Sequence, residues 1–166
     1  MKTAAHLSIG VLSVQGSFAE HCASLRGLGA SVREVRLPQH LEGLDGIVIP
    51  GGESTTLLKL IDTFELREPL RDAIAQGLPA LGTCAGVIVL ARQVSSHDMH
   101  TLEVLDITVA RNAFGRQTES FEEDLLVEPL TGPAFRGVFI RAPIIEACGD
   151  SVRVLSRLQD GTVVAC

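Results

Sequence analysis

One cysteine lies in a pattern that is typical of an enzymatic nucleophile, the stretch Gly82-Thr83-Cys84-Ala85-Gly86. The cysteine has a glycine two residues before it and another two residues after it, and it lies between an apolar strand and a helix. This arrangement predicts a tight turn with the cysteine side chain exposed at its apex. A helix that begins directly after the cysteine also stabilises negative charge on the sulfur through its free N–H groups. A buried cysteine in an ordinary turn fits the same residues. The position straight after a strand nevertheless favours Cys84 as a catalytic nucleophile.

A pair of adjacent glycines provides a second candidate site, in the stretch Pro50-Gly51-Gly52-Glu53-Ser54. Glycines let backbone N–H groups come close to a ligand, and an oxyanion that forms during a reaction needs such donors already in place. Glu53 is suited to hold an ammonium group, and Ser54 is suited to cap the helix that follows. An ordinary strand-to-helix turn with its cap is the competing interpretation of these residues.

Two arginines each follow a predicted strand, Arg111 and Arg141. A guanidinium group binds a carboxylate in a fork geometry, so both are candidates for carboxylate recognition, although a surface arginine is the commoner explanation for either one alone. Five histidines show no spacing typical of metal ligands: His6, His21, His40, His97 and His100. We therefore expect no metal site and no cofactor.

Alternating strands and helices must position these candidates. Short β-branched runs predict strands at 7–14, 31–36, 46–49 and 80–83, and helical patterns lie at 18–28, 55–61, 68–76 and from residue 85 onward. Gly29 is expected to close the first helix. This order predicts a mostly parallel sheet with helices on both faces. Ligands of such sheets bind at the carboxyl ends of the strands, so Gln15, the glycine pair and Cys84 are expected to converge.

The second half of the chain has a different pattern, with strands and few helices. The predicted strands lie at 104–110, 125–127, 138–140, 152–158 and 162–165. We expect them to add antiparallel pairs to the same sheet. No linker and no internal repeat separates the halves, so the predicted fold is one three-layer, mostly parallel α/β domain that spans residues 1–166.

Composition excludes several classes of function. The 166 residues are 46% hydrophobic and 20% charged, as in a globular domain, and the net charge of −6 opposes binding to nucleic acid or to an acidic membrane. No run of apolar residues is long enough to cross a bilayer. Four widely spaced cysteines, Cys22, Cys84, Cys148 and Cys166, favour neither a disulfide framework nor a zinc site. We expect a reduced, cytoplasmic setting.

Taken together, the motifs resemble the glutaminase-subunit family of pyridoxal 5'-phosphate synthases, which are class I glutamine amidotransferases. The matching stretches are Gly10-Val-Leu-Ser-Val-Gln-Gly16, Pro50-Gly-Gly-Glu-Ser-Thr-Thr56, Gly82-Thr-Cys-Ala-Gly86, Arg111-Asn-Ala-Phe-Gly-Arg-Gln117 and Val138-Phe-Ile-Arg-Ala-Pro143. They extend over nearly the whole chain. The stretch around the cysteine is common to all class I amidotransferases, whereas the combination of the second, fourth and fifth stretches is specific to this family.

The resemblance implies a role for each matching residue. Cys84 attacks the side-chain amide of glutamine, and the oxyanion is held by the backbone N–H of Gly51 or Gly52 together with that of Ala85. The implied glutamine-binding residues are Gly52, Glu53, Ser54, Arg111, Ile140 and Arg141. Gln15 matches a residue near the oxyanion site and the partner interface. The implied partner is a barrel-shaped synthase subunit, which receives the ammonia within a large ring assembly.

The resemblance also implies a Cys–His–Glu triad whose His-Pro-Glu motif lies on a late strand. The sequence ends at Thr162-Val-Val-Ala-Cys166, and none of its five histidines lies in that motif. We therefore expect a glutaminase domain without its C-terminal catalytic strand and helix, and we assign no general base. Two alternatives stay open: a catalytically impaired binding subunit of the same complex, and a hydrolase of a related superfamily that shares the cysteine turn.

Overall fold

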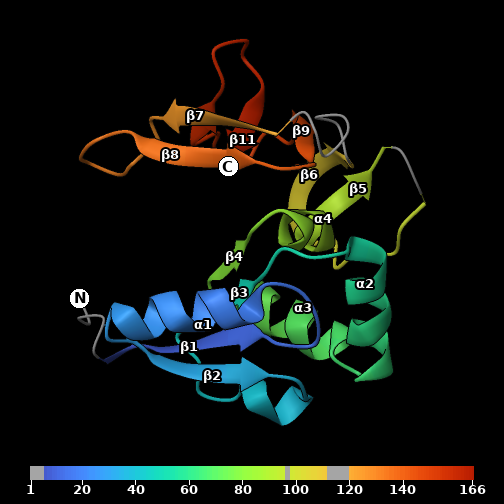
Figure 1. Ribbon diagram of the computed structural model, residues 1–166. Coiled ribbons are helices and arrows are strands. Elements are labelled where there is room, and N and C mark those ends of the chain that lie inside the picture. The colour runs from blue at the N-terminus through green and yellow to red at the C-terminus, as the bar shows by residue number, and fades with distance from the viewer. Residues whose placement is uncertain (1–5, 96–97, 112–119) are drawn as a thin grey trace. The chain divides into compact units, whose positions relative to one another are not determined.

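The computed structural model describes residues 6–95, 98–111 and 120–166 (Figure 1). The chain forms two compact units: Met1–Leu90 with His100–Val104, and Ala91–Met99 with Leu105–Cys166. Each unit has its own sheet. The assignment of residues 1–166 to one domain stays a prediction.

The first unit is built on a four-stranded parallel sheet with the strand order β2-β1-β3-β4. Its strands are β1 (Ser8–Leu12), β2 (Ser31–Val35), β3 (Gly46–Ile49) and β4 (Ala80–Gly82). The register places Ile9 of β1 opposite Val32 of β2. Because all four strands run the same way, their carboxyl ends lie at one edge of the sheet. The segments that contain Gln15, Gly51 and Cys84 follow three of these ends.

Helices cover both faces of this sheet. They are α1 (Phe18–Gly27), the short 3-10 helix η2 (Pro38–Leu41), α2 (Ser54–Thr63), α3 (Arg67–Ala75) and α4 (Ala85–Leu90). On the face that α1 covers, Val11, Cys22 and Val48 form a buried cluster. Side chains alternate along a strand, so Ile49 belongs to the opposite face, where Gly86 of α4 lies against it. The predicted α/β class and parallel sheet are confirmed.

The local sequence explains where these helices form and end. In α2 the buried residues Ser54, Leu57, Leu58 and Ile61 recur at the spacing of one helical face. Gly29 follows α1 with a φ of +86°, and its N–H donates to the carbonyl of Arg26, so the expected closure of this helix by glycine is confirmed.

A five-residue segment, His100–Val104, is held to the first unit by a buried arginine. The Arg67 side chain donates to the Thr101 carbonyl oxygen at 2.8 Å, and its other nitrogens form a fork with the carboxylate of Asp62. Leu102, the residue after Thr101, is fully buried. The segment therefore packs as part of the first core, although it is separated from the rest of that unit along the chain.

An apolar pocket of about 350 Å³ opens in the first unit. Among its lining residues, Leu7, Asp45 and Pro79 precede strands of the parallel sheet, and Leu81 of β4 is exposed. The pocket thus lies toward the amino ends of the strands, away from the loops that carry Gly51 and Cys84.

The second unit consists of strands. Five of them form a mixed sheet with the order β10-β11-β9-β6-β5. Its strands are β5 (Ala91–Val94), β6 (Leu105–Ala110), β9 (Ile144–Cys148), β10 (Ser156–Arg157) and β11 (Val163–Ala165), and a separate hairpin joins β7 (Phe121–Leu125) to β8 (Phe135–Phe139). Only the β5–β6 pair is parallel among the described strands of this unit.

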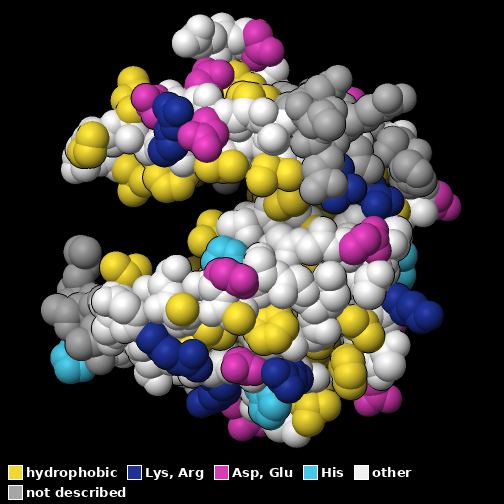
Figure 2. All heavy atoms as spheres, in the orientation of Figure 1, with side chains coloured by type: hydrophobic (Ala, Val, Ile, Leu, Met, Phe, Trp, Pro, Cys, Tyr) yellow, Lys and Arg dark blue, Asp and Glu magenta, His cyan; other side chains and the backbone are white. Residues whose placement is uncertain are grey.

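The hairpin has one apolar and one charged face. Phe121 and Phe139 stack with ring centroids 4.8 Å apart, beside a buried cluster that contains Leu125. On the other face Arg136 pairs with Glu122 at 2.9 Å and with Asp124. The mixture of basic and acidic side chains over β7 and β8 is visible in Figure 2.

Several expectations for the second half are wrong. The strands form separate hydrogen-bonded sheets instead of extending the parallel sheet. The strand predicted at 125–127 is β7 and runs from residue 121 to 125, because Phe121 and Leu125 share the buried face while acidic residues alternate to the outside. Of the strand predicted at 152–158, only Ser156–Arg157 pairs. Strands β5 and β9 were not predicted at all. Antiparallel pairing in this half is confirmed.

Within the described residues, no helix is long and apolar enough to span a bilayer.

Candidate functional site

Cys84 lies in a tight turn between β4 and α4. Its backbone φ is +49°, a left-handed conformation that non-glycine residues rarely adopt, and its side chain is exposed. The flanking glycines are required by close packing. A Cβ on Gly86 would overlap the carbonyl oxygen of Ile49, and a Cβ on Gly82 would lie 2.8 Å from backbone atoms of Gly86. This is the geometry that the Gly-x-Cys-x-Gly spacing predicts, and it presents the sulfur at the carboxyl edge of the sheet.

Gly51 lies against the cysteine. A Cβ on Gly51 would be 3.3 Å from the Cβ of Cys84, so any larger residue here would crowd the thiol. The carbonyl oxygen of Gly51 accepts a hydrogen bond from the Ser17 N–H at 3.0 Å. The structure thus brings the glycine pair next to Cys84, the candidate nucleophile, as the position of both segments after parallel strands predicts.

Gln15 holds the next part of the same loop. Its side-chain oxygen accepts a hydrogen bond from the Glu53 N–H at 3.2 Å, and it lies so close to Gly52 that a Cβ there would overlap it. Gln15 therefore contacts the two residues that follow Gly51. The convergence of Gln15, the glycine pair and Cys84 in the first unit agrees with the expected topology, whereas the catalytic and binding roles of these residues stay predictions.

Glu53, and not Ser54, caps helix α2. The Glu53 carboxylate accepts hydrogen bonds from the N–H of Thr55 at 3.2 Å and of Thr56 at 2.7 Å, and from the Thr55 hydroxyl. The expectation that Ser54 is the cap is wrong, because Ser54 is the first helical residue and its exposure is only 3%. Hydrogen bonding, above all from the Thr55 side chain, lowers the pKa of Glu53 to about 2 although burial opposes this shift. Glu53 is thus negatively charged at neutral pH.

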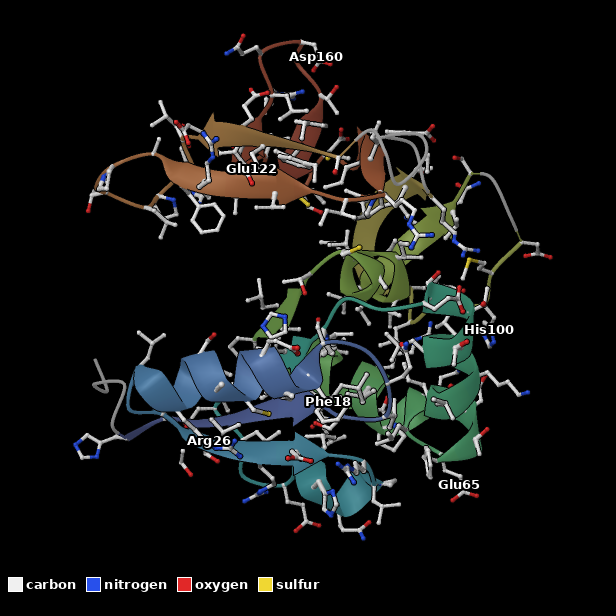
Figure 3. All side chains as sticks on the ribbon, viewed as in Figure 1. Phe18, Arg26, Glu65, His100, Glu122 and Asp160 are labelled. Atoms are coloured by element: carbon white, nitrogen blue, oxygen red, sulfur yellow. The ribbon has the colours of Figure 1, made fainter. Side chains whose placement is uncertain are left out.

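Sequence reasoning missed His21. It lies in the first turns of α1, which begins at Phe18 (Figure 3), and its Nε2 is 3.1 Å from the Oγ1 of Thr83, the residue before Cys84. The two residues are 62 positions apart in the sequence, and no motif links them. The four-residue spacing from Ser17, which also reaches the site, is the one local signal that was available.

The three remaining predicted binding residues belong to the second unit. Arg111 follows β6, and its guanidinium donates to the sulfur of Met99 at 3.6 Å. Ile140 and Arg141 follow β8; Ile140 is exposed, and Arg141 has a φ of +47°. Because Ala110 pairs with Ile144 at the end of the β6–β9 ladder, both arginines lie near that end. Residues 112–117 of the predicted motif lie outside the described residues.

No metal site is found in the part of the chain that the structure describes, because no three of its His, Cys, Asp and Glu side chains gather closely enough.

Comparison with known proteins decides the family. Residues 11–166 match the model of the SNO glutamine amidotransferase family. The chain belongs to this family. A pyridoxal 5'-phosphate synthase subunit PdxT from Corynebacterium jeikeium is 55% identical over 158 residues, which are 94% of this chain and 80% of that protein. The protein of the same name from Dehalococcoides mccartyi is 53% identical over 161 residues, 96% of this chain and 83% of that one.

Solved structures agree with this membership in the SNO glutamine amidotransferase family. A crystal structure of a glutamine amidotransferase is 48% identical, with a TM-score of 0.87 over 93% of this chain and 82% of the other. PurLQS from Thermotoga maritima is 17% identical, with a TM-score of 0.63 over 94% of this chain and 76% of the other. At this low identity, the similarity to PurLQS shows only that the two chains share a fold.

Proposed function

We propose that this protein is the glutaminase subunit of a pyridoxal 5'-phosphate synthase and that it hydrolyses L-glutamine to glutamate and ammonia. The observation that carries the proposal is Cys84, which is exposed in a strained turn at the carboxyl edge of the sheet, with Gly51 packed against it. Membership in the SNO glutamine amidotransferase family supports glutamine as the amide substrate. The relatives that are 53–55% identical are pyridoxal 5'-phosphate synthase subunits, which supports the synthase as the complex.

In the proposed reaction the sulfur of Cys84 attacks the side-chain amide carbon of glutamine. The proton of the thiol passes to the amide nitrogen, the carbon–nitrogen bond breaks, and ammonia leaves while a glutamyl thioester remains on the sulfur. Water hydrolyses the thioester to glutamate and the free thiol. The N–H groups of Ala85 and of Gly51 or Gly52 are the proposed donors to the oxyanion. We assign no general base to a described histidine.

Each of the two units contributes proposed glutamine-binding residues, acidic in the first and basic in the second. Glu53, whose pKa of about 2 keeps it ionised, is the proposed partner of the substrate ammonium group, with Gly52 and Ser54 beside it in sequence. Arg111 and Arg141, with Ile140, are the proposed partners of the substrate carboxylate. Gln15 is proposed to hold the oxyanion loop and to lie near the partner subunit.

The proposed partner is the barrel-shaped synthase subunit, which takes the ammonia through a channel and builds pyridoxal 5'-phosphate from a pentose phosphate and a triose phosphate. We propose that the two subunits form a ring-shaped complex in the cytoplasm. The four free cysteines support a reduced compartment.

The test is glutamate production from L-glutamine by the purified protein mixed with the synthase subunit. We expect glutamate to appear with the wild type and with Cys148→Ala, and to be lost with Cys84→Ala. A complex that forms but produces no glutamate would contradict the glutaminase proposal and favour a binding subunit. Hydrolysis of peptides or glycated amines without any action on glutamine would favour the related cysteine hydrolases.

A further inference from the structure

We propose that His21 is a positioning residue that fixes the Cys84 turn relative to the Gly51 loop. This inference rests on the proposed function, because it assumes that Cys84 is the nucleophile and that the glycine pair provides an oxyanion donor. His21 is half-buried on α1, and its Nε2 lies 3.1 Å from the hydroxyl of Thr83. A neutral imidazole can donate or accept there, and a threonine hydroxyl can do either.

Every polar group of Thr83 has a partner from a different part of the site. Its N–H donates to the carbonyl of Ile49 at the end of β3, and its carbonyl accepts from the N–H of Gly86 in α4. Its hydroxyl meets His21 of α1. Thr83 is thus joined to β3, α4 and α1. The contact with α1 is the one that the Thr83 side chain makes, and His21 provides it.

The strain at Cys84 explains why such anchoring matters. A left-handed residue other than glycine costs about 1–3 kcal/mol and persists when its surroundings hold it in place. Cys84 has this conformation, and Thr83 is the residue directly before it. A loosened Thr83 side chain would let the turn relax toward a less strained backbone, which moves the sulfur.

Helix α1 contacts both halves of the candidate site. Ser17, at its N-cap, donates through its N–H to the Gly51 carbonyl, and His21 lies one turn later, on the same side of the helix. Gly51 itself packs against Cys84. One helical turn therefore connects the glycine loop with the cysteine turn, so His21 determines the position of the nucleophile relative to the proposed oxyanion donors.

The test compares two electrophiles on purified full-length protein with the synthase subunit present. One is a diazoketone analogue of glutamine, which requires the oxyanion donors, and the other is iodoacetamide, which reports on the thiol alone. For His21→Ala we expect the maximal rate of Cys84 modification by the analogue to fall about 10-fold, with little change in the analogue concentration at half-maximal rate. Iodoacetamide should modify Cys84 within about 2-fold of the wild-type rate. Its reaction does not depend on the oxyanion donors, so a displaced sulfur should slow the analogue but not iodoacetamide.

Matched variants separate positioning from general stability. His21→Gln, which places a nitrogen or oxygen near the same point, should recover most of the rate with the analogue. His40→Ala removes another half-buried imidazole that bonds a backbone N–H, that of Arg36, and should leave the rate unchanged. Thr83→Val should slow the analogue reaction as His21→Ala does, and the double variant should be no slower than either one.

The outcomes distinguish the two proposals. If the wild type is not modified at Cys84 by the analogue, the proposed function is contradicted. If the wild type is modified but His21→Ala reacts at the same rate, only the role of His21 is overturned. Equal slowing with both electrophiles, together with a lower free energy of unfolding, would also overturn it, because that result describes a residue needed for folding alone.

Discussion

Gly16 and Gly51 approach each other so closely that a methyl group on Gly16 would overlap the carbonyl oxygen of Gly51. Gly16 also has a φ of +90°, so two separate constraints select glycine there. Because Gly51 packs against Cys84, this contact links the segment after β1 to the proposed nucleophile.

Replacing Gly16 with alanine should therefore disturb both stability and the site. We expect Gly16→Ala to lower the free energy of unfolding by about 3 kcal/mol, of which about 1 kcal/mol is the left-handed backbone and the rest is overlap. Gly43→Ala is the matched control, because Gly43 has a φ of +70° but open space around its Cα. It should cost about 1 kcal/mol. Urea unfolding of the two variants measures the difference, and equal values would show that the close approach is unimportant.

Thiol reactivity should single out Cys84. Cys84 is exposed, whereas Cys22 is 2% exposed. Burial raises the pKa of the Cys22 thiol, and burial, assisted by the neighbouring Cys148, raises the pKa of the Cys166 thiol. The thiolate is the reactive form, so both of these cysteines should react slowly. With limiting iodoacetamide at neutral pH, peptide mapping should find Cys84 modified first. Modification of Cys22 or Cys166 at a comparable rate would contradict this order.

The cap of α2 should make stability depend on pH in acid. The folded pKa of Glu53, about 2, is below its ordinary value of 4.5, so its stabilising contribution is present above pH 4.5 and is lost as the pH falls toward 2. We expect Glu53→Ala to cost about 1 kcal/mol at pH 7 and to differ little from the wild type near pH 2. Urea titrations at several pH values check this. Glu53→Gln keeps one acceptor but does not titrate, and a wild-type pH dependence in that variant would contradict the assignment.

The buried arginine clamp should be sensitive to a conservative substitution. Arg67 is 8% exposed and contacts both the Asp62 carboxylate and the Thr101 carbonyl. Lysine lacks the fork needed for both contacts, so Arg67→Lys should lower the free energy of unfolding by about 2–3 kcal/mol. Arg36 pairs with Glu34 at the surface, and Arg36→Lys should change it by less than about 1 kcal/mol. Equal effects in urea unfolding would show that Arg67 is not a clamp.

The sequence by itself determined the features that depend on a short stretch of chain. The Gly-x-Cys-x-Gly spacing predicted the turn at Cys84, because the glycines that permit it are two residues away on either side. Strand and helix periodicity placed β3 at its observed bounds and α1 within one residue, because each element buries its own apolar face. In the second half this signal was weaker, since acidic residues alternate with the buried positions of β7.

Only the tertiary structure decided which distant groups meet. The contact between His21 and Thr83 joins residues 62 positions apart. It exists because α1 packs on β1 and β3, which brings its first turn to the residue that follows β4. The choice of Glu53 over Ser54 as the cap depends on which side chain the core buries, and the separate sheets of the second unit depend on strand pairing. Local patterns indicate which residues of an element are buried. The partners of a buried side chain depend on which elements pack against each other in the folded protein.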